Sequence, residues 1–175
     1  MPRQPNEGSR RAVMLAELRT IDWGVVARAV HVVAVVIWIG GVWLVTMVLL
    51  PAMREKPAAD WRREFDAIER RFAPQARITA LLVLLSGLYM LYRYDLWNRF
   101  TQAEYWWMDF MVGVWLVFAV LLFVVEPFGL RRLVRRDAAA APEATLARML
   151  RLHRALLALS LLAVFAAVGG SYGLF

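Results

Sequence analysis

Four apolar stretches separated by charged segments dominate the pattern of this 175-residue chain. The cleanest is residues 29–53, which carry no charge over 25 positions. A helix rises about 1.5 Å per residue, so this stretch exceeds the roughly 30 Å hydrocarbon core of a bilayer. Taken together, the stretches predict spanning helices over about residues 24–50, 76–96, 105–127 and 150–174. We therefore expect an all-α integral membrane protein, an antiparallel bundle of four transmembrane helices.

The second and third predicted spans are shorter than the first. Their uncharged parts are residues 78–92 and 110–125. The charges that flank them, such as Arg77 and Arg93, must then lie near the membrane edges, where long side chains reach outward. This division predicts a polar N-terminal tail over residues 1–22 and a four-helix membrane domain over residues 23–175.

A further helix is predicted between the first and second spans. Apolar residues recur at helical spacing at Trp61, Phe65, Ile68 and Phe72, with charged residues between them. This pattern is typical of an amphipathic helix that lies at the membrane interface. Pro74 predicts a break before the second span, because the residue before a proline avoids helical geometry.

Composition supports the membrane assignment and narrows the chemistry. Hydrophobic residues make up 61% of the chain, which is more than a soluble domain normally carries. The absence of cysteine excludes disulfides, thiolate metal ligands and cysteine nucleophiles. The net charge is +7, but the arginines flank the apolar stretches, which indicates contact with lipid headgroups and not with nucleic acid.

The basic residues also predict an orientation. Fourteen of the 21 lie in the two loops after the first and third spans or at the adjoining span ends, against six on the other side, and Arg28 lies within the first span. The positive-inside rule then places both basic loops in the cytoplasm and both termini outside a bacterial-type inner membrane.

His31 is the most informative residue for function, because an ionisable side chain within a membrane span is costly and is usually functional. Arg28, Arg93, Asp109 and Tyr172 are expected at a similar depth, so these residues could converge at the outer mouth of the bundle. His31 and Asp109 could bind Cu²⁺ there. Alternatively, His31 could be the axial ligand of a b-type haem whose acid groups pair with arginines. A purely structural role, with Asp109 paired to an arginine, also stays open.

A second histidine, His153, is expected at the opposite, cytoplasmic start of the last span. The two imidazoles would be separated by most of the bilayer core, so they cannot ligate one iron within one chain. The sequence contains no Walker motif or HExxH signature.

Three short motifs resemble a known family. They are Arg28-Ala-Val-His31 followed by Trp38-Ile-Gly40-Gly41, then Glu69-Arg70-Arg71-Phe72, and then Ser86-Gly87-Leu88. This arrangement resembles the membrane domain of the CopD copper-resistance family and the related HemJ-type protoporphyrinogen oxidases. The resemblance implies a haem-ligating role for His31. The HemJ pattern also has a membrane-embedded lysine, whereas the only lysine here is Lys56, in a loop.

These observations lead to three functional hypotheses. The first is a CopD-like inner-membrane protein that binds or handles copper or a haem-type cofactor near its outer face. The second is a HemJ-like, haem-dependent and quinone-linked oxidoreductase. The third is a non-catalytic subunit of a larger complex. In each case we expect the bilayer as the main partner, with a second copy or another membrane protein as a further partner and no nucleic acid.

Overall fold

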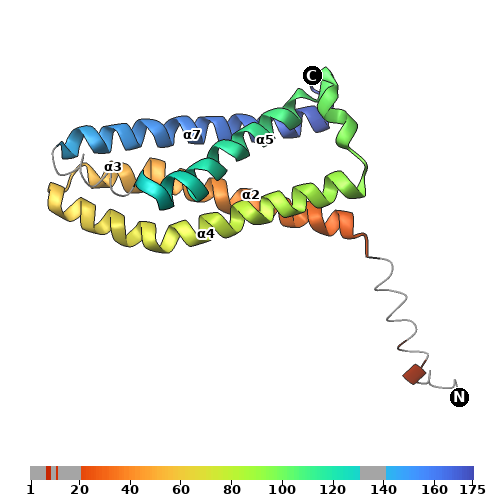
Figure 1. Ribbon diagram of the computed structural model, residues 1–175, viewed down its shortest axis with the longest axis horizontal. Coiled ribbons are helices and arrows are strands. Elements are labelled where there is room, and N and C mark those ends of the chain that lie inside the picture. Colours follow the sequence, from red (N-terminus) through yellow and green to blue (C-terminus); the bar gives the residue numbers. More distant parts are fainter. Residues whose placement is uncertain (1–6, 9–10, 12–20, 131–140) are drawn as a thin grey trace, which may run out of the picture.

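The computed structural model describes residues 7–8, 11, 21–130 and 141–175, with the side chains of residues 58–59, 61–62 and 126–130 outside the description. The described residues contain helices and no strand, which confirms the all-α class (Figure 1). The helices are α2 (Trp23–Leu44), the π-helical η1 (Val45–Leu49), α3 (Leu50–Met53), α4 (Ala58–Arg93), the 3-10 turns η2 (Trp97–Thr101) and η3 (Ala103–Tyr105), α5 (Trp106–Ala119), the π-helical η4 (Val120–Leu130) and α7 (Pro142–Ser171).

Four helical segments of the described residues are long and apolar enough to cross a membrane, as many as the sequence predicts. Their bounds are Trp23–Met53, Arg63–Arg93, Ala103–Val125 and Pro142–Ser171. Large apolar side chains such as Val36, Ile78, Leu116 and Phe165 are exposed on the outside of these helices. An apolar outer surface on every helix is what a lipid environment requires.

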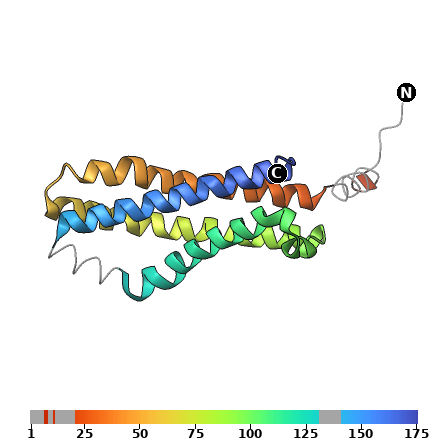
Figure 2. The same cartoon turned by 90° about the horizontal axis from the view of Figure 1, so that it is seen from above.

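Contacts between neighbouring helices give their relative directions. Positions 24, 31 and 41 of α2 lie against positions 94, 86 and 72 of the α4 chain segment, so the two run in opposite directions. Figures 1 and 2 show the same alternation of direction for α2, α4, α5 and α7. The beginnings of α2 and α5 and the ends of α4 and α7 therefore lie together, at what we call the aromatic end.

The break predicted at Pro74 is wrong, because α4 continues through this residue for 36 residues in all. The apolar side chains of Phe65, Ile68 and Phe72 pack against a buried cluster that includes Leu50 and Leu146. A proline inside a helix costs about 3 kcal/mol, and this tertiary packing offsets that cost. The amphipathic segment is thus the first half of α4, and its apolar face covers the bundle.

The interior consists of three clusters along the bundle axis. The middle cluster joins all four long helices through residues such as Trp38, Val83, Phe118 and Leu157. The cluster at the aromatic end has a different composition, since it joins α5 and α7 with Leu91 of α4 and the 94–105 connection. At this end, α2 is held instead by α4, where Tyr94 lies directly over Gly24.

Candidate functional site

The His31 side chain lies between α2 and α4, half-buried, on the same side of α2 as the buried Ala34 and Trp38. Its Nδ1 atom is 3.0 Å from the hydroxyl of Ser86. A Cβ atom placed on Gly87 would lie 3.4 Å from His31 Cε1, in ordinary van der Waals contact, so the imidazole packs directly beside Gly87. The residues Ser86 and Gly87 together form the seat of the ring.

The surroundings of Ser86 determine which imidazole nitrogen carries the proton. The Ser86 hydroxyl has one hydrogen, which it donates to the backbone carbonyls of its own helix, at Leu82 and Val83. Its oxygen is then left to accept a hydrogen bond from Nδ1–H of His31. The carbonyl of Val83 is also an acceptor beside the imidazole. A neutral imidazole has one N–H, so Nε2 keeps its lone pair.

The Nε2 atom of His31 is not fully buried within the described part of the chain. Every buried side-chain nitrogen and oxygen in the described part of the chain has a hydrogen-bond partner. Nε2 has no hydrogen bond to any described residue, so it is not among the buried atoms. An oriented imidazole with an accessible lone pair is the form in which histidine binds a metal.

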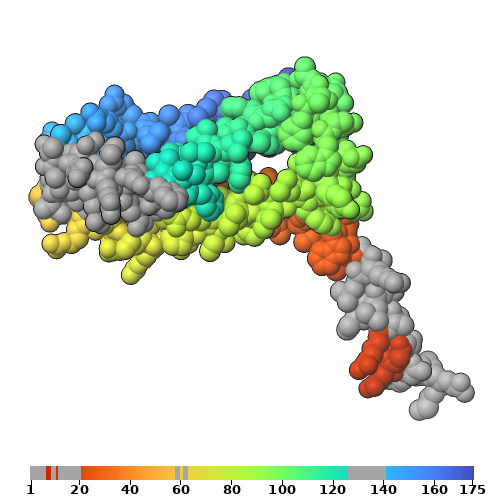
Figure 3. Space-filling model, viewed as in Figure 1, coloured from red at the N-terminus to blue at the C-terminus, as the bar shows by residue number. Residues whose placement is uncertain are grey.

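The α4 and α5 segments separate over part of their length. The α4 and α5 segments meet at Ala80, whose carbonyl accepts a hydrogen bond from Trp115 Nε1, and again at Leu91 in the cluster of the aromatic end. Ser86 and Gly87 lie between these two contacts along α4. Figure 3 shows an opening between α4 and α5, with orange atoms of α2 at its rim. We refer to it as the α4–α5 opening.

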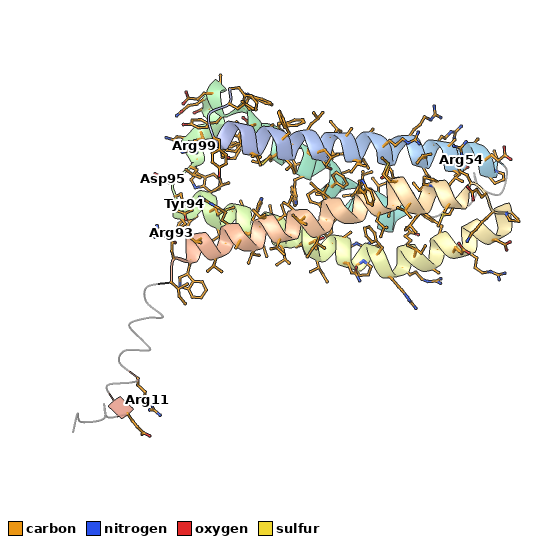
Figure 4. The ribbon with its side chains drawn as sticks, turned by 180° about the vertical axis from the view of Figure 1, so that it is seen from behind. Arg11, Arg54, Arg93, Tyr94, Asp95 and Arg99 are labelled. Atoms are coloured by element: carbon orange, nitrogen blue, oxygen red, sulfur yellow. The ribbon has the colours of Figure 1, made fainter. Side chains whose placement is uncertain are left out.

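Two of the predicted site residues, Arg28 and Arg93, come together around a third residue. The guanidinium carbon of each lies 5.8 Å from the centre of the Tyr94 ring. Figure 4 shows Arg93 and Tyr94 at the aromatic end, where α4 finishes. Tyr94 was not among the predicted site residues, and its position at a helix end gave no signal of this role.

The other predicted residues lie apart from the imidazole. Asp109 is exposed in the first turn of α5, and Tyr172 is 88% exposed at the end of α7. Within the described residues, neither forms a hydrogen bond or ion pair with His31 or an arginine. Their proposed roles in binding a metal or cofactor stay predictions.

His153 has a separate environment, far from His31. Its Nδ1 atom bonds to the carbonyl of Met149, and its own carbonyl lies 3.5 Å from Thr46 Oγ1. Thr46 follows His31 by 15 residues on a continuous helical path, which corresponds to about 20 Å. This separation agrees with the expectation that the two histidines do not share one iron.

The fold and the His31 environment define a class: an all-helical protein with four helices suited to crossing a membrane and one oriented, half-buried imidazole among them. No protein-family model, curated protein or solved structure matches this chain. Among the side chains that the structure describes, no three His, Asp or Glu are grouped so as to hold a metal ion.

Proposed function

We propose that this chain is a multi-pass protein of a bacterial inner membrane that holds a haem-type cofactor near its outer face, with His31 as the axial ligand. The observation that carries the proposal is the hydrogen bond from His31 Nδ1 to Ser86, which leaves Nε2 available as a ligand. The family resemblance of the residues around His31 points in the same direction.

The donor atoms present at this place fit a porphyrin better than a bare copper ion. A porphyrin supplies four ring nitrogens to its iron, so the protein has to supply one imidazole and a largely apolar slot. The α4–α5 opening lies between the Ala80 contact and the aromatic end, the stretch of α4 that includes Ser86. Gly87 packs directly beside the imidazole. When bound, the cofactor would supply redox chemistry, while His31, Ser86 and Gly87 bind and orient it.

The absorption spectrum of the purified protein tests this proposal. We expect a Soret band from bound b-type haem, in about one copy per chain. A colourless protein that retains one copper ion per chain would overturn the proposal in favour of copper handling. A protein that holds neither would overturn it in favour of a non-catalytic subunit. Metal analysis of the same sample separates these outcomes.

The proposed orientation puts the aromatic end outside and the opposite end in the cytoplasm. The basic residues of the loops support this orientation through the positive-inside rule. The 36 residues of α4 correspond to about 54 Å, well beyond the roughly 30 Å hydrocarbon core. We therefore place the first half of α4, with the exposed Arg63 and Arg70, at the cytoplasmic membrane interface.

Reporter fusions check this orientation. Alkaline phosphatase, which is active only outside the inner membrane, should be active when fused after Asn98 and inactive when fused after Lys56. The reverse pattern would contradict the proposed topology. Green fluorescent protein fused at the same two positions is the control, because it should fluoresce only in the cytoplasmic fusion.

A further inference from the structure

Two positively charged side chains share one aromatic ring at the aromatic end. Arg28 comes from the second turn of α2, and Arg93 is the last residue of α4. Both guanidinium carbons lie 5.8 Å from the centre of the Tyr94 ring, within the range of a cation–π contact. Tyr94 itself is fixed by its position over Gly24. The ring is therefore in contact with two cations that come from different helices.

The acidic residues next to this pair along the chain are Asp22 and Asp95, and the Asp22 carboxylate is engaged as the N-cap of α2, where it accepts the hydrogen bond of the Gly24 N–H. One ion pair, between Lys56 and Glu64, lies near the opposite end. Neither Arg28 nor Arg93 has a carboxylate among the described residues within ion-pair distance, and both are exposed. Two like charges around one ring repel each other, and an anion bound to both would remove that repulsion.

The surroundings identify the class of anion. Trp23, Tyr92 and Trp97 are at least half exposed next to this pair along the chain. Exposed Trp and Tyr side chains at the ends of spanning helices mark the level of lipid headgroups. Arginines at this level meet phosphate oxygens, to which a guanidinium donates paired hydrogen bonds.

The geometry points to Arg28, Tyr94 and Arg93 as a binding site for the headgroup phosphate of an anionic phospholipid at the aromatic end. The two guanidinium groups hold the phosphate, and the Tyr94 ring keeps them oriented toward it. The site is separate from the imidazole of His31, so it does not rest on the proposed cofactor. The lipid would tie the start of α2 to the end of α4, where these helices have Tyr94 and Gly24 as their contact.

The experiment measures bound lipid by native mass spectrometry of the full chain, with phosphatidylglycerol and phosphatidylcholine as probes. We expect at least one phosphatidylglycerol to bind per chain, and its affinity to fall at least about tenfold in the double variant Arg28→Gln/Arg93→Gln. The double variant Arg151→Gln/Arg154→Gln removes the same charge at the opposite end and should keep this lipid. Tyr94→Phe should also keep it, whereas Tyr94→Leu should weaken it.

Three results would overturn the inference. One is equal phosphatidylglycerol affinity in the wild type and in Arg28→Gln/Arg93→Gln. Another is equal affinity of the wild type for phosphatidylcholine. The third is loss of the Soret band in Arg28→Gln/Arg93→Gln while its lipid affinity stays unchanged. The two arginines would then bind the acid groups of the cofactor and not a lipid. His31→Ala should bind the lipid like the wild type, so failure of the cofactor proposal is seen separately.

Discussion

Replacing His31 by alanine is expected to remove the Soret band of the purified protein completely. The His31 imidazole is held against Ser86 of α4 through Nδ1, which leaves the Nε2 lone pair as the ligand in the proposed site. Alanine supplies no ligand, so iron would lose its axial bond to the protein. The measurement is the ratio of Soret to protein absorbance after purification in the same detergent.

Two further variants make this test specific. Ser86→Ala removes the group that orients the imidazole but leaves the ligand, so cofactor affinity should fall about 10- to 100-fold without complete loss. His153→Ala should keep the full Soret band, because His153 lies about 20 Å away along the helical path and its Nδ1 is bonded to Met149. An unchanged Soret band in His31→Ala, or its loss in His153→Ala, would refute the role of His31.

The spans were predictable because a helix in lipid must satisfy its own backbone and must be apolar over a known length. This constraint locates all four helices from hydrophobicity alone. The start of the last helix at Pro142 was predictable too, since the fixed φ angle of proline suits a first helical position. These features depend on local sequence.

The continuity of α4 was not predictable from local sequence. Pro74 is a correct local signal of helix interruption. The opposing contribution comes from residues far along the chain, because Phe72 packs on Gly41 and the buried cluster around Leu146. Contacts of this kind become visible only when the helices are placed side by side.

The site shows the same division between local and tertiary information. His31 stands out in the sequence because it is ionisable within an apolar span. Its partner Ser86 looked like part of a small-residue packing seam. A comparison of depth could have found it, since His31 lies eight residues after Trp23 and Ser86 lies eight residues before Tyr94. Tyr94 gave no such signal, because its role depends on the missing side chain of Gly24.

A substitution at Gly41 of α2 is expected to lower the stability of the protein, whereas the same substitution at the adjacent Gly40 is not. A Cβ atom on Gly41 would lie 2.6 Å from Cζ and 2.7 Å from Cε2 of Phe72, so Gly41→Ala must displace the ring that seats the first half of α4. Overpacking of this kind costs about 1–3 kcal/mol, and we expect a clearly lower unfolding temperature in detergent. At Gly40, a Cβ atom would meet no other atom within 4 Å.

Gly40→Ala is therefore the matched control for Gly41→Ala, one residue away on the same helix. It should leave the unfolding temperature unchanged or raise it, because alanine is up to about 1 kcal/mol more favourable than glycine within a helix. Adding Phe72→Leu should remove most of the effect of Gly41→Ala, since the ring atoms that clash are then absent. Equal unfolding temperatures for Gly40→Ala and Gly41→Ala would show that the Phe72 ring is not closely packed against Gly41 of α2. The first half of α4 would then be held on the bundle by the Leu50 and Leu146 cluster alone, and the Gly41 contact would contribute nothing to the passage of the helix through Pro74.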